Sequence, residues 1–234
     1  MTYEMSGFDP RYGGWPMPWA WNGHDHFRYY DEVLAIVVPE AARRYRFSTA
    51  MPNFGKDRIR FPEQAFAYKE RVLRFAHAVN PLFDIEVPLF MEQSTNPETI
   101  REGFERGAWR TAKFYPAGGT TNSDEGVNFL RLEELDPCVA MLARLNMLAL
   151  IHAEPTHSHD GEELDVFDRE GASLPIIDAM LRRHPTLKVT FEHISTELGA
   201  SQVKAWKAEG FQVEATVAPQ YLLWNRNELF HRGM

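Results

Sequence analysis

Apolar positions along the chain follow two spacings, one typical of helices and one typical of buried strands. Apolar residues at steps of three and four predict four helices, which begin at or near Phe61, Asp136, Ile177 and residue 198. Pro137 supports the second start, because proline at the first helical position gives up only an N–H with no partner inside the helix. Pro185 stops the third helix, and Gly210 is a left-handed end for the fourth.

Seven short runs that are apolar, or that alternate apolar and polar residues, lie between these segments. They are residues 21–28, 46–53, 84–90, 111–115, 147–153, 187–193 and 212–219. Several are almost entirely apolar, as expected for strands covered on both faces. Alternating strands and helices predict parallel strands with right-handed crossovers. A doubly wound sheet gives the same alternation, but no glycine-rich phosphate loop follows the first run. The pattern therefore favours an α/β fold of the (β/α)8 TIM-barrel type with only seven strands evident.

Composition narrows the class of protein. The 234 residues show no linker or repeat, so we expect a single domain over 1–234 with a Trp-, Pro- and Gly-rich lead-in over 1–22. The charge of 25 − 33 = −8 argues against a nucleic-acid partner. Runs of about 18 apolar residues are absent, so no membrane span is expected. Cys138 is the only cysteine, which excludes an internal disulfide and fits a reducing cytoplasm.

Histidines follow several predicted strands at the end where barrel enzymes carry their chemistry. His24 and His26 are two residues apart, so on a strand both side chains point to one face and can hold one metal ion. His152 and His193 end two later strands. Each alone would fit a hydrogen-bonded core histidine, but four at the ends of three strands favour metal binding.

Lys113 lies inside an apolar strand, where an uncompensated ammonium is strongly disfavoured. Such a lysine either reaches solvent or pairs with an acid. A third solution is chemical: a neutral amine reacts with CO2 to give a carbamate, whose two oxygens can bridge two metal ions.

Together these segments resemble a known family. The motifs are HDHFR, MPNF, AKFYPAGGTTNS, IHAE, DVFDRE, FEHIST and APQYLLWNRN, which span residues 24–227 in order. They resemble the bacterial-type single-function dihydroorotases of the amidohydrolase superfamily.

The resemblance implies a barrel with two zinc ions bridged by a carboxylated lysine. His24 and His26 match the ligands of the more buried zinc, and Lys113 matches the lysine that carries the CO2-derived carbamate. His152 and His193 match the ligands of the second zinc. The implied reaction is the reversible cyclisation of N-carbamoyl-L-aspartate to (S)-dihydroorotate in pyrimidine biosynthesis.

The resemblance also assigns substrate contacts. Arg28 and Asn53 match residues that hold the substrate carboxylate, a role that suits the two-pronged guanidinium. Thr120 and Thr121 match a mobile loop that closes over the substrate. The implied partner is a small-molecule substrate. Whether the protein also forms a homodimer is left open by the sequence.

Some positions depart from the family pattern. Asp25 replaces a leucine and is tolerated only if polar groups lie behind its strand. His157 and His159 lie in a long loop, where solvated histidines are expected rather than ligands. Glu154 and Glu192 are expected to support the site.

The largest departure concerns the eighth strand, whose aspartate is both zinc ligand and general base in the family. No counterpart follows the seventh run, so we expect a C-terminally incomplete barrel with little or no activity of its own. Three interpretations stay open: a dihydroorotase sequence that ends early, a related cyclic amidase or lactonase for another carboxylate-bearing substrate, and a non-catalytic barrel remnant.

Overall fold

Parallel strands alternate with helices along the chain, as the sequence predicts. The computed structural model describes residues 20–229 and 231, so the expected lead-in lies outside the described residues up to residue 19. The strands are β1 (Trp21–Asp25), β2 (Phe47–Ala50), β3 (Asp84–Glu86), β4 (Leu89–Met91), β5 (Thr111–Phe114), β6 (Leu148–Ile151), β7 (Lys188–Phe191) and β8 (Gln212–Ala215). The helices are α1 (Asp31–Arg44), α2 (Pro62–Ala76), α3 (Pro97–Glu105), α4 (Asp136–Arg144), α5 (Arg169–Arg183) and α6 (Glu197–Ala208).

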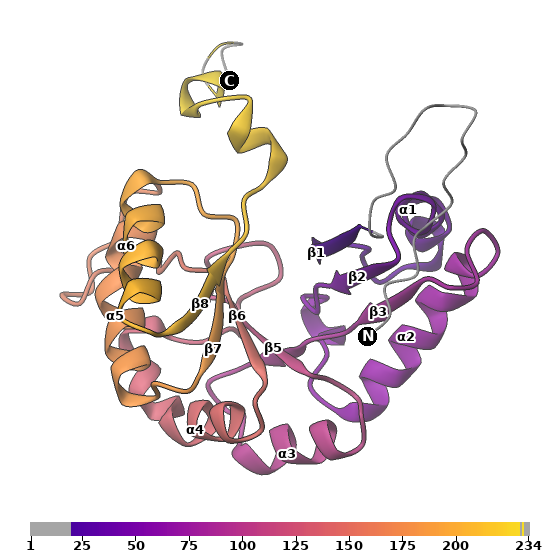
Figure 1. The fold of residues 1–234 in the computed structure, drawn as a ribbon, viewed down its shortest axis with the longest axis horizontal. Coiled ribbons are helices and arrows are strands. Elements are labelled where there is room, and N and C mark those ends of the chain that lie inside the picture. The colour runs from indigo at the N-terminus through magenta and orange to yellow at the C-terminus, as the bar shows by residue number, and fades with distance from the viewer. Residues whose placement is uncertain (1–19, 230, 232–234) are drawn as a thin grey trace.

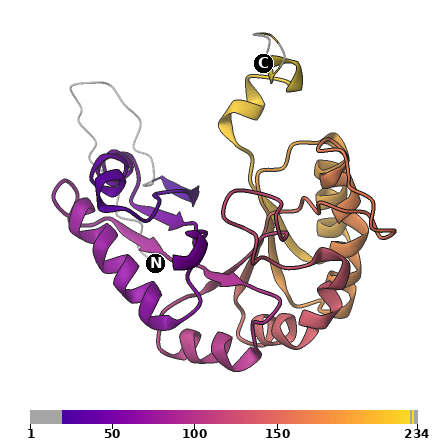
Figure 2. The same ribbon diagram turned by 180° about the vertical axis from the view of Figure 1, so that it is seen from behind.

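The strands follow one another in chain order in two sheets, β1-β2-β3 and β4-β5-β6-β7-β8, which together form a curved wall with the helices on its outer side (Figures 1 and 2). Every strand pair is parallel, from β1 beside β2 to β7 beside β8. This is the arrangement of a barrel wall, in which the carboxyl ends of all strands meet at one rim.

The third predicted strand is the one place where the strand prediction was wrong. Residues 84–90 form two short strands instead of one, so eight strands are described where seven were expected. β3 pairs only with β2 and β4 only with β5, so the sheet divides between them at Val87 and Pro88. Proline has no N–H to donate to a ladder, which accounts for the break.

The four predicted helices are present as α2, α4, α5 and α6, and Gly210 has the expected positive φ of 97°. Two further helices, α1 and α3, were not predicted from the apolar spacing. α1 contains Pro39 and has no side-chain cap at its start. α3 begins at Asn96 and Pro97, where the Asn96 side chain accepts the N–H of Thr99 at 2.9 Å. The pair Asn96 and Pro97 could have predicted this helix start, because asparagine is a favoured N-cap residue and proline is favoured at the first helical position.

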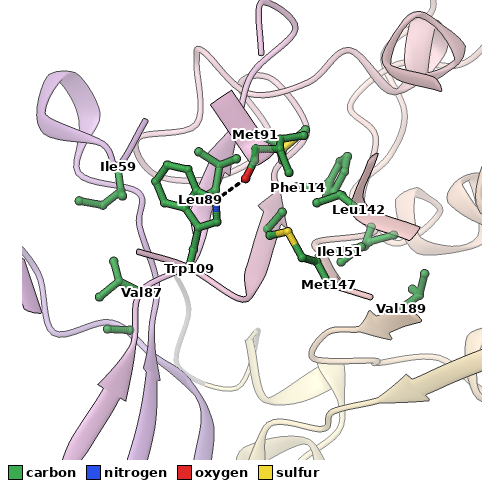
Figure 3. Packing of buried hydrophobic residues seen from close by; sticks show 14 of the residues in the cluster. Ile59, Val87, Leu89, Met91, Trp109, Phe114, Leu142, Met147, Ile151 and Val189 are labelled. Atoms are coloured by element: carbon green, nitrogen blue, oxygen red, sulfur yellow. Dashed lines mark hydrogen bonds between the residues drawn. The ribbon is translucent and has the colours of Figure 1, made fainter. Parts of the chain in front are cut away.

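A single hydrophobic cluster fills the space between the sheet and the helices. Trp109 is fully buried in it, and its indole N–H donates to the carbonyl of Ile100 at 3.2 Å (Figure 3). Gly103 on α3 makes room for this ring, because a Cβ there would lie 2.0 Å from the indole.

The sheet is open between its first and last strands. Within the described residues β1 pairs only with β2 and β8 only with β7, so each has one unpaired edge. The two edges approach each other at one point, since a Cβ on Gly23 would lie 3.9 Å from the methyl carbon of Thr216. None of the helices in the described part of the chain has the length and apolar character needed to cross a bilayer.

The packing around Trp109 gives a stability test. We expect Gly103→Ala to lower the free energy of unfolding by about 1–3 kcal/mol, because the added methyl group overpacks a filled site. Gly171→Ala on α5 is the matched control. Its Cβ would meet nothing nearer than 3.5 Å, so stability should stay within about 1 kcal/mol of the wild type. Urea unfolding measures both, and equal effects would contradict this account of the core.

Candidate metal centre

The first two predicted ligands face each other at the rim of the sheet. His24 lies in β1 one residue before its end, His26 is the first residue after it, and their Nε2 atoms are 3.1 Å apart. Two imidazole nitrogens at this distance can converge on one cation, as the spacing of the pair predicts.

Glu192 orients the first of these rings. Its carboxylate Oε1 lies 2.9 Å from His24 Nδ1, so this nitrogen donates its proton and the Nε2 lone pair is left toward His26. A carboxylate behind a histidine in this way fixes the tautomer and orientation of a metal ligand. Burial, followed by the charge of Lys113, lowers the pKa of His24 to about 3.

Lys113 is fully buried on β5 and forms an ion pair with the same Glu192. Burial lowers the pKa of its ammonium well below the usual value, while Glu154 acts in the opposite direction. Of the three solutions that the sequence left open, full burial excludes reaching solvent, an acid partner is present in Glu192, and the carbamate is not tested.

The other two histidines lie beside this group. The ring centroids of His152 and His193 are 4.5 Å apart, and those of His24 and His193 are 5.4 Å apart. Burial lowers the pKa of His193 to about 2 and lowers that of His152 as well. His152 Nε2 lies 3.1 Å from a carboxylate oxygen of Glu154.

His193 adopts a left-handed backbone conformation, with φ of 41°. Successive residues of a regular strand point to opposite faces, and this conformation breaks that alternation just after β7. Glu192 and His193 can therefore both face His24, and ligand atoms of these three residues lie within 4.8 Å of one another.

The donor set fits divalent cations. Neutral imidazole nitrogens are the form in which histidine binds metal, and the lowered pKa values keep the rings of His24, His26 and His193 neutral at pH 7. Within the described residues, Glu192 is the carboxylate hydrogen-bonded to His24 and Glu154 is the one hydrogen-bonded to His152, and none of the carboxylates at the four histidines comes from an aspartate.

The predicted substrate residues lie at the same rim. Asn53 is buried, and its side chain donates to the carbonyl of Thr121 at 2.9 Å and accepts from the hydroxyl of Tyr115 at 3.0 Å. The loop that contains Thr120 and Thr121 is thus held against Asn53. Arg28 is exposed, with φ of 70°.

The departures from the family pattern find physical explanations. The carboxylate of Asp25 accepts a hydrogen bond from the side-chain amide of Asn22 at 2.8 Å. This is the polar partner that the sequence analysis expects behind the strand. His157 and His159 are exposed, as expected for loop histidines. Tyr115 and Thr216 were missed, because their contacts join segments far apart in the sequence.

The lowered pKa values of the histidines at the rim, among them the half-buried His193, make the metal-free protein sensitive to acid. Because the pKa of His193 is depressed in the folded state, its stabilising contribution is present above the unfolded value of about 6.5. It is lost as the pH falls below that value toward the folded pKa. We expect the free energy of unfolding, measured in chelator, to fall between about pH 7 and pH 5.

His193→Asn should make this dependence less steep, since asparagine tolerates the left-handed conformation, while His24 and His26 keep the rest of the slope. His159→Asn, at an exposed position, should leave it unchanged. A slope in His193→Asn as steep as that of the wild type would contradict the assignment.

Comparison with known proteins agrees with this geometry. The chain is 38% identical over 203 residues to the dihydroorotase of Azoarcus sp., covering 86% of this chain and 56% of that protein. It is 39% identical over 212 residues to that of Ralstonia pickettii, covering 90% and 58% respectively. No protein-family model matches the chain.

A solved structure shows the same fold. Dihydroorotase from Saccharomyces cerevisiae, crystallised with 5-fluoroorotic acid, superposes with a TM-score of 0.82 at 24% identity. The match covers 91% of this chain and 59% of that one. The predicted TIM-barrel class is confirmed over this part of the barrel. The chain is a homologue of the dihydroorotases that spans little more than half the length of the relatives it matches.

Proposed function

We propose that the chain forms the metal- and substrate-binding part of a dihydroorotase-like cyclic amidohydrolase. The observation that carries the proposal is the convergence of four neutral imidazoles and one buried lysine from four strands. The substrates would be N-carbamoyl-L-aspartate and dihydroorotate, and the identity to dihydroorotases supports this choice.

In this proposal His24 and His26 hold one zinc ion, and His152 and His193 hold the other. Two divalent cations would supply an activated water and polarise the ring amide carbonyl. Glu192 holds His24 in its tautomer, and the Glu192 side chain is itself buried in the barrel wall.

Lys113 joins the two halves of the site as a carbamate. Its lowered pKa favours the neutral amine that reacts with CO2. The carbamate would be an anion beside the buried carboxylate of Glu192, which is costly unless cations offset the charge. Carbamate formation and metal binding should therefore depend on each other.

Arg28 and Asn53 would bind the substrate carboxylate. Arg28 offers a charged, exposed guanidinium at the rim, and Asn53 is already held in place by Tyr115. The Thr120–Thr121 loop rests on Asn53 and would cover the bound ligand. The yeast enzyme was crystallised with an orotic acid derivative, a ring that also bears a carboxylate.

Turnover also needs an acid–base group for the leaving nitrogen. The described residues offer no aspartate at the imidazoles, so we expect this chain to bind ligands while turning them over slowly. Loss of such a group costs about 10²–10⁴-fold in rate.

Zinc stoichiometry tests the bridge. After removal of metal, the chain should bind about two zinc ions when bicarbonate is present and fewer when CO2 is excluded. Lys113→Met should bind no more than about one ion under either condition, because the bridge is lost. Lys69→Met, a half-exposed lysine paired with Asp84, is the control.

The double variant Lys113→Met/Glu192→Gln removes both buried charges. It separates loss of the bridge from misfolding caused by an unpaired carboxylate. Retention of both zinc ions in Lys113→Met or in the double variant would overturn the carbamate assignment.

Ligand binding tests the substrate. Calorimetric titration should show dihydroorotate binding to Arg28→Ala about 10- to 100-fold more weakly than to the wild type, because a charge-assisted hydrogen bond is worth about 1.5–3 kcal/mol. Arg43→Ala, on the exposed side of α1, should bind normally. Unchanged binding in Arg28→Ala would contradict the role of Arg28 at the dihydroorotate carboxylate and favour a related cyclic amidase or lactonase for another carboxylate-bearing substrate.

A further inference from the structure

The backbone that carries His193 is held by four consecutive N–H groups. The N–H of His193 donates to the Thr216 hydroxyl at 2.9 Å, and that of Ile194 donates to the Thr216 carbonyl at 2.8 Å. The next two N–H groups, those of Ser195 and Thr196, donate to the carboxylate of Glu170 at 2.8 and 3.0 Å. One side of the turn is therefore fixed by Thr216, the residue after β8, and the other by the side chain of Glu170.

The Glu170 carboxylate accepts its hydrogen bonds from the residues that end this turn. It lies in the first turn of α5 and is 4% exposed. Besides the two N–H groups, it accepts the hydroxyl of Ser195 at 2.7 Å and that of Thr196. A carboxylate has about four acceptor positions, so the bonds from two adjacent residues match its full capacity.

The surroundings are shaped to admit this carboxylate. A Cβ at Gly199 on α6 would lie 2.4 Å from Glu170 Oε1, so only glycine leaves the space open. Thr196 also caps α6, where its hydroxyl oxygen accepts the N–H of Gly199 at 3.0 Å. The start of α6 and the end of the His193 turn thus both pack against the buried carboxylate of Glu170.

The turn needs such support because of the conformation of His193. A non-glycine residue at φ of 41° is strained and persists only where the surroundings determine it. Thr216 and Glu170 hold the backbone on either side of that strained residue. Glu170 lies in the first turn of α5, the helix that follows the loop after His152.

We propose that Glu170 is a positioning residue that holds the His193 turn in the conformation needed to bind the second metal ion. The inference rests on the proposed function for its metal, while its structural part concerns the turn alone. Loss of a group that orients a metal ligand typically lowers metal affinity by about 10- to 100-fold.

Glu170→Gln tests the proposal, because the amide has one acceptor oxygen and a donating NH2 group that faces the donors of Ser195 and Thr196. In zinc titrations followed by calorimetry, the weaker of two binding steps should lose about 10- to 100-fold in affinity and the other should keep its affinity. Glu162→Gln, an exposed glutamate in the preceding loop, should behave as the wild type.

Hydrogen exchange gives a second readout that needs no metal. In Glu170→Gln the amides of Ser195 and Thr196 should exchange faster, while that of Ile194, held by Thr216, should change less. Ser195→Ala removes one hydroxyl bond at an exposed position. It should weaken the same zinc step by a smaller factor, and it decides the matter if Glu170→Gln fails to fold.

The outcomes separate the two proposals. If the wild type binds no second zinc, the proposed function fails, and exchange at Ser195 and Thr196 still tests the hold on the turn. If the wild type binds two ions and Glu170→Gln and Ser195→Ala bind them equally well, the role of Glu170 is overturned.

Discussion

The burial of Lys113 beside Glu192 is the constraint on which the centre of this barrel depends. An ammonium inside an apolar sheet is costly, so burial lowers the pKa of Lys113 and favours the neutral amine, while Glu192 offsets the charge of the protonated form. The same carboxylate fixes the tautomer of His24, so charge balance and ligand orientation are achieved by one residue. Removing either partner would leave an uncompensated buried charge, at a cost of about 3–5 kcal/mol.

The fold brings this group together through topology. Parallel strands place their carboxyl ends at one rim, so residues from β1, β5, β6 and β7 meet although they are far apart in sequence. Burial at that rim then keeps the imidazoles neutral, which is the state needed to bind cations. The fold thus explains both the positions of these residues and their protonation.

Sequence reasoning predicted the strands, and it predicted that the histidines lie at one rim, because both follow local rules. Alternation and apolar runs located the strands, and the two-residue spacing of His24 and His26 predicted their common face. The division of the third strand at Pro88 was readable in principle from the missing N–H. The Asn96–Pro97 start of α3 was readable as well.

Other features could not be read from local patterns. A strand rule places Glu192 and His193 on opposite faces, and only the left-handed φ of His193 brings both toward His24. That conformation depends on Thr216 and Glu170, whose contacts form only when β8 and α5 are in place. Tertiary contacts therefore decide the geometry of the last ligand.

Two arrangements of metal are compatible with the charges at the rim. One has two zinc ions joined by a carbamate on Lys113, and the other has a single ion held by His24, Glu192 and His193 while Lys113 keeps its proton. Anomalous diffraction at the zinc edge, from crystals grown with zinc and bicarbonate, distinguishes them most directly. The account predicts two anomalous peaks with electron density for a carbamate on Lys113 Nζ between them. A single peak between His24, Glu192 and His193, with Lys113 unmodified, would contradict it.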